Sequence, residues 1–156
     1  MAKSISYRLT ETDRRVLNEI QSDFPLTPRP FKTIAEKLDL SESAVIETVT
    51  RLKTQGIIRR IGGNFVPHKL GYVSTLCAAR VPEDQIEAFA ETVNRFQGVT
   101  HNYQRDGDYN VWFTFIAPSR QIIRQNLEQI ALETGLGDIL NLPATAVFKI
   151  KAEFAL

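Results

Sequence analysis

Three side chains that could do acid–base and anion chemistry stand at alternate positions late in the sequence. His101, Tyr103 and Arg105 are spaced i, i+2 and i+4 in a segment whose composition predicts a β-strand over 99–105. Because side chains alternate along a strand, all three should share one face of a sheet. An imidazole, a phenol and a guanidinium there would provide a proton donor, a second acid and a carboxylate-binding cation.

A second strand, predicted after the Asp-Gly-Asp turn, brings aromatic residues to the same hairpin. With a two-residue loop His101 lies opposite Trp112, and with a three-residue loop it lies opposite Phe113. A slip of one residue moves every side chain to the other face, so the aromatic partner stays open. Val111, Phe113 and Phe115 alternate as core residues would, which leaves Trp112 for a dimer interface or a ligand wall. The aromatic candidates for the site are Tyr109 and Trp112.

A basic group earlier in the chain is a second candidate for anion binding. Arg59 and Arg60 precede a Gly-Gly turn that leads toward His68 and Lys69. Solvated surface positions are the plainer interpretation of these four residues. A lone strand histidine such as His101 is likewise more often a hydrogen-bonded structural residue. As a cluster, the four basic residues could bind several carboxylates.

Composition excludes several classes of function. The chain has 156 residues, 43% of them hydrophobic, which indicates an ordered globular protein of one or two small domains. Its 19 Lys+Arg and 18 Asp+Glu give a net charge of +1, so bulk charge does not predict polyanion binding. The single cysteine, Cys77, excludes an internal disulfide and a multi-cysteine metal site. No apolar run could span a membrane and no secretory signal is recognised, so a cytoplasmic protein without a membrane partner is expected.

The sequence changes character near residue 66. Residues 1–66 carry 11 Lys/Arg and 8 Asp/Glu, a net of +3, whereas residues 67–156 carry 8 and 10, a net of −2. The two parts also differ in hydrophobic periodicity. We therefore expect two domains, with the boundary at this position.

The first domain, 1–66, is predicted to be a winged helix-turn-helix. Capping residues and apolar spacing predict helices after Thr12-Asp13, from Phe31 to Leu38, and after Ser41. Two short strands, 57–61 and 65–66, should flank a Gly-Gly-Asn turn. Three helices and a hairpin in this order are typical of that DNA-binding architecture.

The second domain, 67–156, alternates strands and helices. The order predicts an α+β fold with a ferredoxin-like βαββαβ sheet. Strands are predicted over 73–81, 99–105 and 109–117, helices from Pro82 to Phe96 and from Ser119 to Thr134, and extended segments over 139–142 and 145–154.

This domain order resembles the Lrp/AsnC family over nearly the whole chain. The phrases LTETDRRVLNEIQ, IAEKLDLSESAVIETVTRLKTQGIIRRIG and GDYNVWFTF carry the resemblance. It implies DNA binding by the third helix, dimerisation through the C-terminal sheet, and in some members an amino-acid ligand. DNA-binding members carry basic residues after the position of Val45, where this chain has Ile46, Glu47 and Thr48. A carboxylate beside DNA phosphate lowers affinity, so DNA is not expected as a partner.

Three phrases resemble a branch of this family, the sirohaem decarboxylases: HNYQRDGDYNVWFTF, GGNFVPHKLGY and LNLPATAVFKI. The resemblance implies removal of CO2 from two acetate side chains of sirohaem, giving didecarboxysirohaem in alternative haem or haem d1 biosynthesis. It implies no cofactor beyond the iron of the substrate tetrapyrrole, with bound haem product as a further ligand. It also implies a heterodimer of two similar subunits, or a homodimer formed through the C-terminal sheet.

The resemblance assigns roles to the candidate residues. His101 would be the proton donor or the axial ligand of the substrate iron, two roles that exclude each other at any moment. Tyr103 would be a second acid or an orienting group, and Arg105 would bind a substrate carboxylate. The alternative hypothesis is an Lrp/AsnC-type transcription regulator that senses an amino acid or haem through the same sheet. Further substrate contacts are assigned to Arg59, Arg60, His68, Lys69, Tyr109 and Trp112.

Overall fold

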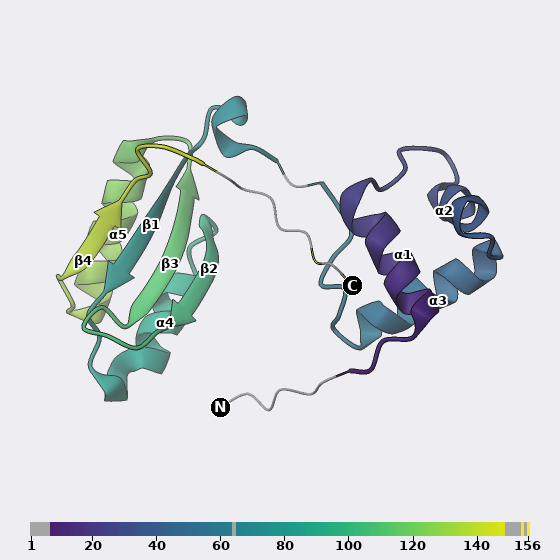
Figure 1. Cartoon of the computed structure of the whole chain (residues 1–156). Helices are drawn as coiled ribbons and strands as arrows, with labels where there is room; N and C mark the ends of the chain where they lie inside the picture. The colour runs from purple at the N-terminus through teal and green to yellow at the C-terminus, as the bar shows by residue number, and fades with distance from the viewer. Residues whose placement is uncertain (1–6, 64, 149–153, 155) are drawn as a thin grey trace. The chain divides into compact units, whose positions relative to one another are not determined.

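The computed structural model describes residues 7–63, 65–148, 154 and 156. It divides into two units, Met1–Gly63 with Lys149–Leu156, and Asn64–Phe148. Figure 1 labels the helices of the first unit and the sheet and helices of the second. No helix among the described residues has the length and hydrophobicity needed to cross a bilayer.

The first unit contains three helices: α1 (Glu11–Ser22), α2 (Pro30–Leu38) and α3 (Glu42–Thr54). A capping box formed by Thr10 and Asp13 begins α1, so the cap lies two residues before the predicted one. Ser41 caps α3 as predicted, because its hydroxyl accepts from the Ala44 amide at 3.1 Å. The core residues are Val16, Leu17, Ile34, Ala35, Val45, Val49, Leu52 and Ile58.

The predicted wing does not form strands. Residues 57–63, 65 and 66 contain none. The amides of Ile57 and Ile58 instead donate to the Leu52 carbonyl at 3.0 and 3.1 Å, and Ile58 is buried in the helical core. An isolated two-stranded ribbon is marginally stable, so these apolar residues are better buried against α3.

The second unit is a four-stranded antiparallel sheet in the order β2-β3-β1-β4, with both of its α-helices behind it (Figure 1). This is the predicted ferredoxin-like topology. A 3-10 turn, η2 (Glu83–Gln85), precedes the first of these helices, where the sequence predicted α-helix from Pro82. The elements are β1 (Val73–Ala79), α4 (Ile86–Asn94), β2 (Val99–Gln104), β3 (Val111–Ala117), α5 (Arg120–Thr134) and β4 (Ile139–Leu142).

The predicted final strand over 145–154 is wrong where it can be checked. Residues 145–148 and 154 are not in a strand, and 149–153 lie outside the described residues. The backbone of Phe154 exchanges two hydrogen bonds with the side chain of Gln21, at 2.8 and 3.0 Å. The end of the chain therefore bonds to α1 of the first unit.

The sheet has one covered face and one open face. Alternate residues of β3, from Val111 to Ala117, are buried against the helices, as the sequence predicted. Trp112, Thr114 and Ile116 point to the open face and are half-buried. The open face, which no helix of this unit covers, is where His101 and Tyr103 lie.

Gly98 allows β2 to approach β3 closely. A Cβ atom on Gly98 would lie 2.4 Å from the Ile116 carbonyl oxygen and 2.5 Å from the Phe115 ring. The Gly98 carbonyl accepts from the Ile116 amide at 2.8 Å, and the ladder then shifts by one residue between Val99 and His101. A larger residue would push the start of β2 away from its partner.

Candidate active site

A cavity of about 350 Å³ lies on the open face of the sheet. It brings together all three residues of the predicted acid–base and anion set with one of the two aromatic candidates. Its walls come from β1, β2, β3 and the loop that joins the last two. The lining residues are Leu76, His101, Tyr103, Arg105, Trp112, Phe113 and Thr114.

The hairpin register differs from both predicted alternatives. His101 lies opposite Thr114, and Tyr103 lies opposite Trp112. The Arg105 amide donates to the Asn110 carbonyl at 2.8 Å, so the loop has four residues rather than two or three. As in the two-residue alternative, Trp112 shares the face of Tyr103, where it forms a wall of the cavity.

His101 and Tyr103 form a small stacked pair at the cavity. Their ring centroids are 6.0 Å apart and their planes differ by 25°. His101 Nδ1 lies 3.1 Å from the Thr100 hydroxyl, which leaves Nε2 as the nitrogen able to face a ligand. Both rings are exposed, so protons can exchange between the imidazole and solvent.

Arg105 supplies positive charge at the end of this row. It is exposed, and no ion pair within the described residues includes it. A guanidinium can bind a carboxylate through two parallel hydrogen bonds. The cavity therefore combines an exchangeable proton with a cation that an anionic ligand can neutralise.

Trp112 and Leu76 form the apolar part of the cavity. The indole N–H of Trp112 donates to the Tyr109 carbonyl at 2.7 Å, which fixes the ring orientation. Leu76, 42% exposed, was missed by sequence reasoning because it begins the uninterrupted apolar run Leu76–Ala79, which hides the alternation of the strand. Its alternation with the fully buried Cys77 was the signal that could have placed it on the open face. Thr114 was missed because its position depends on the register.

Tyr109 does not line the cavity. Its hydroxyl donates to Asp138 Oδ1 at 3.1 Å, and Arg80 lies over its ring at 5.4 Å from the centroid. The hydrogen bond to Asp138 raises the pKa of the Tyr109 phenol. Its contribution to the cavity is the carbonyl that holds Trp112.

The predicted basic group is divided between the two units. Arg59 and Arg60 are exposed residues of the first unit, whereas His68 and Lys69 are exposed on the 3-10 turn η1 (Pro67–Leu70) of the second. None of the four lines the cavity. The η1 turn leads into the end of the sheet opposite to Arg105, because β1 begins there.

Cys77 takes no part in the open face. It is fully buried on the helix side of β1, and burial raises the pKa of its thiol to about 12. Such a thiol stays protonated near neutral pH, which makes it a poor metal ligand or nucleophile. Among the described residues, no three His, Cys, Asp or Glu side chains are grouped as they would be to hold a metal ion.

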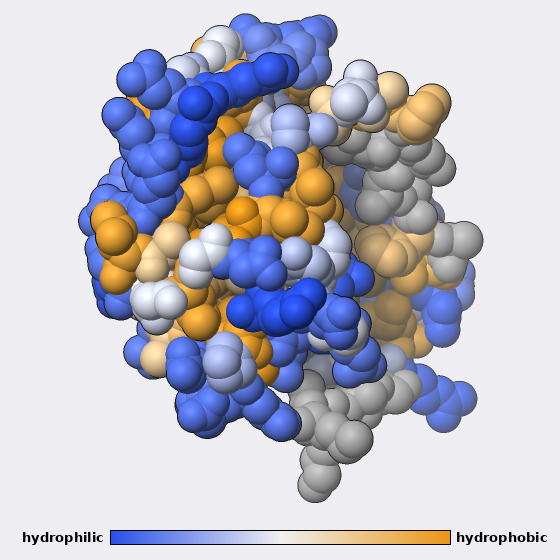
Figure 2. Space-filling model, turned by 90° about the vertical axis from the view of Figure 1, so that its left-hand side faces the viewer, coloured by the Kyte–Doolittle hydropathy of each residue, from blue (hydrophilic) through white to orange (hydrophobic). Residues whose placement is uncertain are grey.

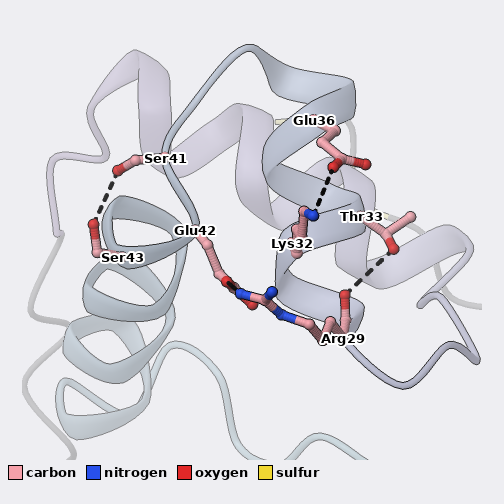
Figure 3. Close-up of polar contacts among 7 residues, drawn as sticks. All are labelled: Arg29, Lys32, Thr33, Glu36, Ser41, Glu42 and Ser43. Atoms are coloured by element: carbon pink, nitrogen blue, oxygen red, sulfur yellow. Dashed lines mark hydrogen bonds and ion pairs between the residues drawn. The ribbon is translucent and has the colours of Figure 1, made fainter.

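Two arginines beside α3 form ion pairs inside the first unit, while Lys53 of the same helix is in none of the ion pairs found among the described residues. Glu42, in the first turn of α3, forms an ion pair with Arg29 at the start of α2, as Figure 3 shows. Arg51, late in α3, pairs with the buried carboxylate of Asp13. These two cations are engaged by protein carboxylates, which weakens their use against DNA phosphates.

A helix-turn-helix followed by a ferredoxin-like sheet with a ligand-sized cavity defines the AsnC-like class. The family models agree: residues 69–149 match the "AsnC-like ligand binding domain", and residues 13–59 match the "Siroheme decarboxylase NirDL-like HTH domain". The chain is 52% identical to the siroheme decarboxylase alpha subunit of Desulfovibrio desulfuricans over 91% of this chain and 82% of that protein. The chain belongs to the family of sirohaem decarboxylase subunits.

Solved structures extend the comparison. The siroheme decarboxylase NirDL in complex with an iron-uroporphyrin III analogue is 33% identical to the chain, with a TM-score of 0.63. The match covers 82% of this chain and 42% of that one. An AsnC family transcriptional regulator from Agrobacterium tumefaciens is 21% identical, has a TM-score of 0.76 over 94% of this chain and 96% of that chain, and shows the fold alone.

Proposed function

We propose that this chain is a carboxy-lyase subunit that removes CO2 from acetate side chains of sirohaem to give didecarboxysirohaem. The observation that carries the proposal is the meeting of His101, Tyr103 and Arg105 in one cavity with an aromatic wall. Membership in the family of sirohaem decarboxylase subunits, and likeness to a structure solved with an iron-uroporphyrin III analogue, support the same substrate class.

The chemistry needs an anion site and a proton. Breaking the bond between the acetate methylene and its carboxyl carbon releases CO2 and leaves the electron pair on the methylene, where the macrocycle delocalises it. In this proposal Arg105 binds a carboxylate of the substrate, and His101 delivers a proton from Nε2 to the methylene carbon. Tyr103, stacked beside the imidazole, orients it or acts as a second acid. Solvent then returns a proton to the exposed His101.

The cavity suits a flat ligand that is covered from its other side. Trp112 and Leu76 offer apolar surface, and Leu142, opposite Leu76 in the ladder, is also 42% exposed. Figure 2 views the edge of the sheet at β4, where hydrophobic residues lie between hydrophilic ones, and the cavity lies on the adjoining open face. A macrocycle lying there would leave one face bare, so we infer a second similar subunit, or a second copy, as its cover.

The remaining basic residues extend the proposal to the rim of the substrate. Sirohaem carries eight carboxylates, more than one arginine can neutralise. His68 and Lys69, both exposed on η1 of the same unit as the cavity, are the candidates for propionates at its rim. Haem, the later product of such a pathway, would bind the same cavity, since it too is a flat iron tetrapyrrole with carboxylates.

Anaerobic turnover tests the proposed function. The protein is mixed with sirohaem, alone and with a coexpressed similar subunit, and CO2 release and the absorption spectrum of the pigment are followed. We expect turnover that falls at least about 100-fold in His101→Ala, because the proton donor is lost. Wild-type turnover in that variant would remove the role of His101, and absence of CO2 from the wild-type pair would refute the function.

The two roles of His101 are separated by spectroscopy. If the imidazole ligates iron, His101→Ala changes the absorption and electron paramagnetic resonance spectra of bound sirohaem before any CO2 is released. If it only donates a proton, those spectra match the wild type and turnover alone is lost. The proposal of proton donation requires the second result.

A further inference from the structure

Asn110 bonds the hairpin loop to the two strands on either side of it. Its Oδ1 accepts from the Val81 amide at 2.9 Å, and its Nδ2 donates to the Val81 carbonyl at 2.8 Å. Its own amide donates to the Ala79 carbonyl at 3.1 Å, and its carbonyl accepts from the Arg105 amide at 2.8 Å. One residue thus connects the end of β1, the start of β3 and the end of β2.

Two cavity residues depend on this connection. The backbone of Arg105 is bonded directly to Asn110. Trp112 is two residues further along β3, and its indole is held by the carbonyl of Tyr109, the neighbour of Asn110. If the loop moved away from β1, two interactions would be lost together. One is the hydrogen bond from the Trp112 indole to the Tyr109 carbonyl, and the other is the backbone bond that fixes Arg105.

We propose that Asn110 is a positioning residue, which sets the loop length and thereby holds Arg105 and Trp112 at the substrate. The part that concerns substrate rests on the proposed decarboxylase function. The part that concerns the loop rests on the geometry alone. Asn110 touches no reacting atom in this proposal and acts only through Arg105 and Trp112.

An amide is the side chain that this position requires. Val81 is 3% exposed and presents one donor and one acceptor to position 110, and only a group with both can satisfy them. A carboxylate could accept from the Val81 amide but would face the Val81 carbonyl with like partial charge. Alanine would leave both backbone groups of a buried residue without these bonds.

The first test is an emission measurement that requires no substrate. Trp112 is the single tryptophan, so its fluorescence reports the loop directly. At pH 8 we expect Asn110→Asp to shift the emission to longer wavelength, because the indole loses its fixed bond and meets more water. At pH 3, below the ordinary aspartate pKa of about 3.9, the introduced carboxyl is protonated and again offers a donor and an acceptor, so the emission should move back toward the wild-type maximum.

Matched references keep this test specific. The charged groups at this end of the sheet include Arg80, Arg105, Asp106, Asp108 and Asp138, and His101 shares the cavity, so the wild type is measured at each pH. Asn94→Asp is the control for the same chemical change, because Asn94 acts as an acceptor from Asn102, at 3.1 Å, and a carboxylate keeps that role. Wild-type emission from Asn110→Asp at both pH values would overturn the positioning role.

The second test separates binding from chemistry. With sirohaem at pH 8, Asn110→Asp should raise KM about 10-fold, as expected for the loss of one hydrogen bond and a misplaced cation, and leave kcat within about two-fold. A fall in kcat at unchanged KM would overturn the proposal, because it would place Asn110 in the chemical step. If the wild type has no turnover, the decarboxylase function fails, while the emission result still decides the loop.

Discussion

Two arginines beside α3 of the helical unit are used inside the fold, whereas Arg105 on the open face of the sheet is not. Arg51 pairs with Asp13, a carboxylate that is 1% exposed, and Arg29 pairs with Glu42. Arg105 on the sheet has no ion-pair partner in the part of the chain that the structure describes. Arg29 and Arg51 can stabilise the helical unit, and Arg105 remains available for a ligand.

This difference indicates where an anion would bind. A helix that reads DNA needs cations directed at phosphates and base readers near its N-terminal end. In this chain α3 begins with Ser41, Glu42 and Ser43, and Figure 3 shows Glu42 directed at Arg29 and the two serines bonded to each other. The anion-binding capacity lies instead with Arg105, beside a proton donor and an aromatic wall.

Removing the unpaired cation should give the largest effect. Arg105→Ala is expected to weaken sirohaem binding about 100-fold, since two charge-assisted hydrogen bonds are lost, and to leave the thermal unfolding temperature unchanged. Titration of the pigment by absorbance measures the first, and calorimetry the second. Arg120→Ala, an exposed arginine at the start of α5, is the control and should bind as the wild type does. Equal affinity in both variants would end the proposed role of Arg105.

Removing the buried carboxylate should affect stability instead. Burial acts to raise the pKa of Asp13, but hydrogen bonds from Thr10 and Arg51 outweigh it and hold that pKa below its usual value of 3.8. Asp13→Asn should therefore lower the free energy of unfolding by about 2 kcal/mol at pH 7. Because the native pKa is the lower one, the wild type loses this contribution as pH falls below about 4, and the two proteins should converge.

Urea unfolding at pH 7 and pH 3 measures this difference. Asp23→Asn, an exposed aspartate at the end of the same helix, is the control and should behave as the wild type at both pH values. A difference in unfolding free energy between wild type and Asp13→Asn that is the same at both pH values would contradict the pairing of Asp13 with Arg51. Lowered sirohaem affinity in Asp13→Asn at pH 7 would contradict the separation of the two regions.

Local patterns predicted much of the fold because they act over a few residues. The alternation from Val111 to Ala117 placed β3 with its covered face, and the i, i+2, i+4 spacing put His101, Tyr103 and Arg105 on one side of β2. The four-residue loop could not be predicted this way. It depends on bonds between Asn110 and β1, which is about 30 residues earlier in the chain.

Tertiary contacts also set the roles of Ile58 and Arg51. Ile57 and Ile58 have strand composition, but their amides cap α3 and Ile58 fills the helical core. Arg51 and Lys53 are the two cations late in α3, the helix that would face DNA, and the structure pairs Arg51 with Asp13 of α1. In each case a tertiary contact decided the role of a residue whose local pattern pointed elsewhere.

Breaking the surface pair at α3 should give the smallest effect, and it tests most directly whether ion pairing separates the helical unit from the sheet in anion binding. Glu42→Gln frees Arg29, but Arg29 is 64% exposed, so unfolding free energy should change by less than about 1 kcal/mol. If internal pairing is what keeps this unit from DNA, the variant should bind duplex weakly at low salt, and the binding should vanish as salt rises. A mobility-shift titration measures duplex binding at about 20 to about 200 mM salt, a range over which the screening length of surface charges shortens about three-fold. Duplex binding by the wild type as strong as that by Glu42→Gln would show that the Arg29–Glu42 pair does not keep this unit from DNA. The unpaired charges of the helical unit, rather than those of the open sheet face, would then already suffice to bind a polyanion.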